Sequence, residues 1–246
     1  MKKKAQIMGM PATIDINDSH SKEEDIAEIL SYLRDIDEIF STYKQNSEIE
    51  KINRKELEAE NASTIVKEIL RLCERTKTET NGYFEAYHNG KIDPSGIVKG
   101  YAIFHAAEKF TQKGYLNFYL EIAGDIEVRG FRPNGKKWKI GIENPFNRQE
   151  IIKVVYLSGK GIATSGTYIR GNHIYNPVNG EITNDIVSIS VIGPNVYEAD
   201  RFATAAFAMG EKGIEFIEKL EGFEGYMITK ERRAIYTSQF EKYLLE

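Results

Sequence analysis

The chain has 246 residues, of which 41% are hydrophobic and 28% are charged, and its formal net charge is −4 at pH 7. This length allows a substantial core, and the acidic balance argues against nucleic acid as a partner. No stretch approaches the roughly 20 apolar residues of a membrane helix. No apolar run of signal-peptide length follows the N-terminal lysines, and the single cysteine, Cys73, cannot form an internal disulfide. We therefore expect a cytoplasmic protein that does not insert into membranes.

The first 80 residues are typical of one strand followed by amphipathic helices. Residues 5–17 alternate as a strand that is broken at Gly9 and Pro11. Apolar residues then recur at helical spacing over 21–40 and again over 63–78. This pattern predicts two helices, each with one buried face.

Two local signals predict further helices. Ser47 with Glu50 three residues later resembles a capping box, so we expect a short helix there. Asp93-Pro94-Ser95-Gly96 is a tight turn that enters a helix extending through Phe110, and the preceding stretch 83–89 looks irregular.

Beyond Gly114 the apolar period changes to two, which indicates strands. Helices are expected at 199–209 and 214–220. This mixture favours a single α+β domain over residues 1–246. The strand candidates are 115–120, 126–131, 138–142, 151–157, 187–192, 226–229 and 233–236.

The stretch 161–180 holds a lone histidine between two turns. A small-residue turn is expected at 163–166, and a second turn at Asn179-Gly180. His173 would then lie at a strand edge or in a loop, where a ring nitrogen can face a cavity. Taken alone, a half-buried histidine bound to a backbone carbonyl is the better interpretation, because a titratable residue forms a site only when partners converge on it.

Two stretches combine an acid with flexible backbone. Residues 93–100 place Asp93 and Lys99 at a helix start, where free N–H groups attract phosphate. An ordinary capping turn explains the same residues equally well. Ala123-Gly124-Asp125 follows a strand and offers close backbone approach to a ligand, although a hairpin bulge is the favoured interpretation.

Asp200 and Thr204 are four residues apart in an apolar helix, so both oxygens lie on one face. A carboxylate with a hydroxyl suits a hard cation such as Mg²⁺. The alternative is that Asp200 caps the helix and Thr204 bonds back to the carbonyl of Asp200.

Taken together and in order, eight stretches resemble the FAD:protein FMN transferases, also called ApbE-type flavin transferases. The resemblance extends from Met8 to about Gly213. It rests on MGMP (8–11), FSTYKQNSEIEKIN (40–53), NGYFEA (81–86), DPSGIVKGYA (93–102), AGD (123–125), ATSGTYIR (163–170), HIYNP (173–177) and EADRFATAAFAMG (198–210).

The resemblance implies a T-shaped α+β fold with a mixed or antiparallel sheet and flanking helices, which binds FAD and Mg²⁺. It implies transfer of FMN from FAD to a Thr or Ser of an acceptor flavoprotein, with release of AMP. The metal ligands would be Gly96, through its carbonyl, with Asp200 and Thr204. The residues matching flavin-nucleotide contacts are Met8, Tyr43, Tyr83, Phe84, Glu85, Asp93, Lys99 and His173.

We assign His173 the role of general base, since a Thr hydroxyl is a poor nucleophile near neutral pH. The chain departs from the family pattern at Ala123, Glu85, Asn176 and His105, where the family has Gly, Asp, Asp and often an acid. Two other functions use the same residues. One is an FAD pyrophosphatase giving FMN and AMP, and the other is a flavin-binding protein without catalysis.

Overall fold

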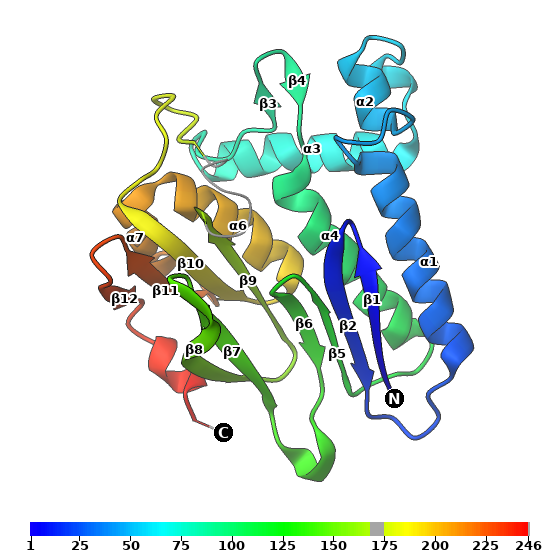
Figure 1. Ribbon diagram of the computed structural model, residues 1–246, viewed down its shortest axis with the longest axis vertical. Helices are drawn as coiled ribbons and strands as arrows, with labels where there is room; N and C mark the ends of the chain where they lie inside the picture. The colour runs from blue at the N-terminus through cyan, green and yellow to red at the C-terminus, as the bar shows by residue number, and fades with distance from the viewer. Residues whose placement is uncertain (168–174, 246) are drawn as a thin grey trace.

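The computed structural model describes residues 1–167 and 175–245, and its central element is an eight-stranded sheet (Figure 1). Each pairing of neighbouring strands in it is antiparallel. The sheet is open, with β1 and β12 at its two edges. In spatial order the strands are β1 (Lys2–Ile7), β2 (Met10–Ile16), β5 (Phe118–Ile122), β6 (Asp125–Arg129), β9 (Lys160–Gly166), β10 (Ile186–Gly193), β11 (Glu224–Thr229) and β12 (Ala234–Tyr236).

Helices and a hairpin cover opposite faces of this sheet. On β9, Ile162 packs with the hairpin of residues 138–157 whereas its neighbour Ala163 packs with the helix of residues 196–208, because successive side chains of a strand point to opposite faces. The helices are α1 (Glu23–Phe40), α2 (Glu48–Asn53), α3 (Thr64–Glu79), α4 (Ser95–Gln112), α6 (Val196–Ala208) and α7 (Gly213–Glu218), with 3-10 turns at Ala59–Asn61, Pro133–Gly135, Gly210–Lys212 and Phe240–Tyr243. The two hairpins outside the sheet are β3 (Tyr87–His88) with β4 (Lys91–Ile92), and β7 (Trp138–Asn144) with β8 (Asn147–Leu157).

The predicted helices are confirmed to within a few residues. Helix α1 buries one apolar face that includes Ile26, Ile29 and Leu33, as its periodicity requires. Before α2, the Ser47 hydroxyl accepts a hydrogen bond from the Glu50 amide at 3.0 Å, which is one half of the predicted capping box. Among the described residues, no helix has both the length and the apolar character needed to cross a bilayer.

The predicted turn at 163–166 is wrong, because these residues form the end of β9. This strand lies inside the sheet between β6 and β10. Its small residues serve close packing rather than a turn: Ala163 is buried against α6, and Gly161 lies directly under the start of that helix. Small side chains at a helix–sheet contact and in a turn look alike in a sequence.

The break in the strand at 5–17 is a two-residue hairpin turn. Met8 and Gly9 have φ of 53° and 70°, as the turn between β1 and β2 requires. Ala123 and Gly124, with φ of 49° and 90°, form the same kind of turn between β5 and β6, so the interpretation as a bulge is also wrong. This second turn is bound to strand β2, because the Ala123 amide donates to the Pro11 carbonyl at 3.0 Å. The stretch 83–89, expected to be irregular, ends in strand β3.

We expect Gly161→Ala to lower the free energy of unfolding by about 3 kcal/mol, because overpacking at fixed backbone is costly. A methyl group on Gly161 would overlap the backbone of Asn195 and Val196 at the start of α6. Gly141→Ala is the matched control: the three atoms nearest to its methyl group all belong to the side chain of Ile151, the closest at 2.8 Å, and Ile151 is 53% exposed, so a side chain rather than backbone has to move. Urea denaturation of both variants measures the difference, and equal losses would contradict the assigned packing.

Candidate active site

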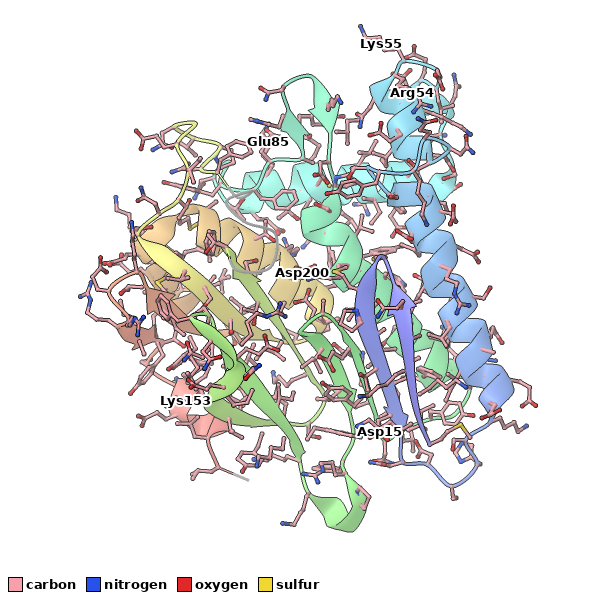
Figure 2. All side chains as sticks on the ribbon, in the orientation of Figure 1. Asp15, Arg54, Lys55, Glu85, Lys153 and Asp200 are labelled. Atoms are coloured by element: carbon pink, nitrogen blue, oxygen red, sulfur yellow. The ribbon has the colours of Figure 1, made fainter. Side chains whose placement is uncertain are left out.

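A cleft of about 860 Å³ opens where the first turn of α4, the end of β9 and the middle of α6 meet. Its other walls are the 83–86 segment, the β3–β4 hairpin and residues of the 175–182 segment. This volume is within the range of small-molecule pockets. In Figure 2, Asp200 lies between α6 and α4, and Glu85 lies above it near the end of α3.

Three oxygen donors predicted to bind a cation come together in this cleft. The Thr204 hydroxyl on α6 points to the Gly96 carbonyl on α4, at 3.5 Å. Asp200 lies one turn earlier on α6, is 5% exposed, and lines the same cleft. It does not cap the helix: Asn195 does so, by accepting a hydrogen bond from the Glu198 amide at 2.9 Å. One carboxylate, one hydroxyl and one carbonyl form a hard oxygen set that fits Mg²⁺.

The approach of α4 to α6 depends on Gly100. Its amide donates a hydrogen bond to Asp200 Oδ2 at 2.8 Å. A methyl group on Gly100 would lie 2.7 Å from the Asp200 Cβ and 3.0 Å from the Val196 carbonyl oxygen. Only glycine at this position therefore lets the two helices bring the cation donors together.

Negative charge is concentrated below these donors. Asp125, fully buried on β6, pairs with Lys99 Nζ at 2.8 Å, and its other oxygen accepts the Thr164 amide at 3.2 Å. Burial, followed by the nearby charge of Asp125, raises the pKa of Asp200, while Lys99 opposes the rise. Two buried carboxylates facing a single ammonium favour the binding of a further cation.

The start of α6 is held by a third buried carboxylate, that of Glu127. Glu127 lies two residues after Asp125 on β6. Its carboxylate accepts a hydrogen bond from the Val196 amide at 2.7 Å and pairs with Arg129 at 3.0 Å. Burial raises the pKa of Glu127 to about 7, and Arg129 opposes the rise. An acid at a helix N-terminus accepts hydrogen bonds from free N–H groups, so Glu127 holds the N-terminus of α6 in place. Asp200 lies one turn after this N-terminus.

The far wall of the cleft is tied to α2 by Asn53. Its side-chain amide accepts a hydrogen bond from the Ile92 N–H at 2.7 Å and donates one to the Ile92 carbonyl at 3.0 Å. These are the two backbone hydrogen bonds that a neighbouring strand would otherwise make with Ile92 of β4. Asn53 also donates to Glu50 at 3.1 Å, and both side chains line the cleft. This wall brings a helix from the first quarter of the chain to the site.

The structure brings together most of the predicted site residues and places two outside the cleft lining. Met8 lies in the β1–β2 turn, packed against the core, and Tyr43 is 89% exposed beside the cleft residue Thr42. His173 lies outside the described residues. The predicted residues that line the cleft are Tyr83, Phe84, Glu85, Asp93, Gly96, Lys99, Asp200 and Thr204.

Sequence reasoning did not include three polar residues that bear on the site. Asp125 was visible in the AGD stretch, but its pairing with Lys99 across the fold was not. Thr164 and Ser165 line the cleft from β9, and their assignment to a turn concealed this. Within the described ranges, no cluster of three or more His, Cys, Asp or Glu side chains could hold a metal, whereas the donors predicted in the cleft are one carboxylate, one hydroxyl and one carbonyl.

Comparison with known proteins decides the family. The sequence model of the ApbE family matches residues 8–90 and 85–227. The chain belongs to the ApbE family. Among relatives of this ApbE-family chain, the FAD:protein FMN transferase of Escherichia coli (strain K12) is 31% identical over 167 residues, which are 63% of this chain and 48% of that protein. That of Haemophilus influenzae is 35% identical over 140 residues, 52% and 40% of the two chains. The chain spans about half the length of the curated relatives it matches.

Solved ApbE structures share the fold. The ApbE protein from Thermotoga maritima matches with a TM-score of 0.87 at 20% identity, over 100% of this chain and 99% of that one. The flavin transferase ApbE from Vibrio cholerae matches with a TM-score of 0.83 at 24% identity, over 99% of both chains. The predicted α+β class, with an antiparallel sheet and flanking helices, is confirmed. The assignment of residues 1–246 to a single domain stays a prediction.

We expect Asp200→Asn to raise the free energy of unfolding near pH 7, without added metal, by about 1–3 kcal/mol. The pKa of Asp200 rises on folding from its ordinary 3.8 to about 8, chiefly through burial. The folded state therefore binds more protons than the unfolded state, and the wild-type protein loses this stability as the pH rises from about 4 to 8. The neutral amide removes that loss.

Thermal denaturation in EDTA at pH 5 and pH 7.5 measures the effect, which is larger at pH 7.5. Asp15→Asn is the control, because Asp15 lies at the lower end of β2 in Figure 2, well apart from Asp200, and pairs with Lys2 only at 3.9 Å. A destabilised Asp200→Asn protein at pH 7.5 would contradict the assigned charge environment.

Proposed function

We propose that this protein is a Mg²⁺-dependent FAD:protein FMN transferase. It cleaves the pyrophosphate of FAD, joins FMN by a phosphoester bond to a Thr or Ser of an acceptor flavoprotein, and releases AMP. The observation that carries the proposal is the meeting of the Gly96, Asp200 and Thr204 oxygens beside Lys99 in one cleft. Relatives that bear the name FAD:protein FMN transferase support it.

The residues of the cleft divide into a charged floor and an aromatic wall. Mg²⁺ bound by Gly96, Asp200 and Thr204 would neutralise charge on the pyrophosphate oxygens. Lys99, oriented by its 2.8 Å pair with Asp125, places an ammonium on the same floor. Tyr83 supplies aromatic surface on the adjoining wall, with the buried Phe84 behind it, and this surface suits a flat ring system.

In the proposed transfer, the acceptor hydroxyl oxygen forms a bond to the phosphorus of the FMN half. The bond from that phosphorus to the bridging oxygen breaks, and AMP leaves with this oxygen. His173 takes the hydroxyl proton, a role that rests on the family resemblance of HIYNP. The expected cytoplasmic location, the identity of Mg²⁺ as the metal and the Thr or Ser target all stay predictions.

We expect His173→Ala to lower the rate of FMN transfer by ~10²–10⁴-fold, the usual contribution of a general base, while FAD binding is retained. The measurement is mass spectrometry of the FMN adduct on a candidate acceptor incubated with the protein, FAD and Mg²⁺. His20→Ala is the control, because His20 stacks on Tyr115 with ring centroids 5.0 Å apart and does not line the cleft.

Product analysis separates the three functions. Transfer requires an adduct and AMP that appear together and depend on the acceptor. Release of FMN at the same rate with and without the acceptor would show a pyrophosphatase instead. FAD that stays intact with Mg²⁺ and a competent acceptor would show a flavin-binding protein. Full transfer by the His173→Ala variant would overturn the role of His173 alone.

A further inference from the structure

A buried arginine adjoins the candidate cation ligand. Arg201 follows Asp200 on α6, and its side chain is 3% exposed. Its Nη2 and Nε contact Glu198 Oε2 at 2.5 and 2.8 Å, and its Nη1 pairs with Glu79 at the end of α3. The guanidinium also lies 4.0 Å from the centre of the Phe202 ring. A charge buried this deeply is retained only when its partners satisfy it on several sides.

Arg201 joins two elements that are separated by more than a hundred residues. Glu79 also pairs with Arg75 at 2.7 Å, so the network alternates in sign along Arg75, Glu79, Arg201 and Glu198. Although burial opposes it, the two arginines lower the pKa of Glu79. The last turn of α3 is therefore held to the segment of α6 that carries Asp200.

The same turn of α3 supports the aromatic wall of the cleft. The Thr80 hydroxyl donates to the Thr76 carbonyl at 2.7 Å and accepts the Phe84 amide at 3.1 Å. Lys77 pairs with Glu85 at 2.5 Å. The Phe84 ring in turn lies against Gly96, since a methyl group there would be 3.0 Å from it. Residues 83–85, which form the aromatic wall, are thus held in place by the end of α3.

We propose that Arg201 is a positioning residue that sets the spacing between the cation donors on α6 and the 83–85 wall, and thereby couples cation binding to nucleotide binding. This rests on the proposed function only for the identity of the ligands. Arg201 itself does not line the cleft. It acts through the backbone of Asp200 on one side and through Glu79 and the end of α3 on the other.

Hydrogen exchange of the ligand-free protein tests the spacing directly. In Arg201→Lys and Glu79→Gln, we expect the Phe84 and Gly100 amides to exchange about 10-fold faster or more, the effect of losing a charged hydrogen bond. A lysine keeps the charge but cannot contact both carboxylates with one planar fork. Glu224→Gln is the matched control: Glu224 is 5% exposed and pairs with Lys242 at 3.0 Å on β11, away from the cleft.

Ligand binding supplies the second readout. With Mg²⁺ present, the Kd for FAD should rise about 10-fold in both variants and stay within about 2-fold of wild type in Glu224→Gln, even if all three lose similar thermal stability. Unchanged exchange at Phe84 and Gly100 in the two variants would overturn the inference. Failure of the wild-type protein to bind FAD would instead contradict the proposed function. The hydrogen-exchange result would still decide the role of Arg201.

Discussion

The hydrogen bond from the Gly100 amide to the buried carboxylate of Asp200 is the contact on which the site depends. It joins α4 to α6 at a distance that only glycine permits. One turn before Gly100 on α4 is the Gly96 carbonyl, and one turn after Asp200 on α6 is the Thr204 hydroxyl, so a single close approach aligns both. The arrangement of the proposed cation donors is consequently a property of the helix pair rather than of either helix.

This helix pair carries an electrostatic cost that the surroundings offset. Asp200 and Asp125 are both buried, and Lys99 pairs with Asp125 alone, so ionisation of Asp200 adds a charge that has no ion-pair partner among the described residues. Such groups persist where the rest of the fold supplies enough stability to hold them, which is how binding sites trade stability for function. Here the support comes from apolar clusters on both faces of the sheet.

Helix α6 is the element that most of these contacts hold in place. Glu127 and Asn195 bind its first amides, β9 lies beneath it through small residues, and Arg201 ties its second turn to α3. The open edge of the cleft is formed by segments that leave this core, including the β3–β4 hairpin (Figure 1). A floor of packed helices beneath a wall carried by loops suits the proposed transfer, in which a second protein would enter the site.

The sequence by itself determined the helices and most strands, and it supplied the residues that we propose as cation donors, because apolar periodicity, capping residues and motif order are local properties. It also indicated the family. Only the tertiary structure decided that 163–166 is a strand, since small residues serve a turn and a close helix contact equally well. It alone joined Asp125 to Lys99 and Arg201 to Glu79, because pairings between residues 26 and 122 positions apart depend on how the sheet and helices pack, which no local pattern records.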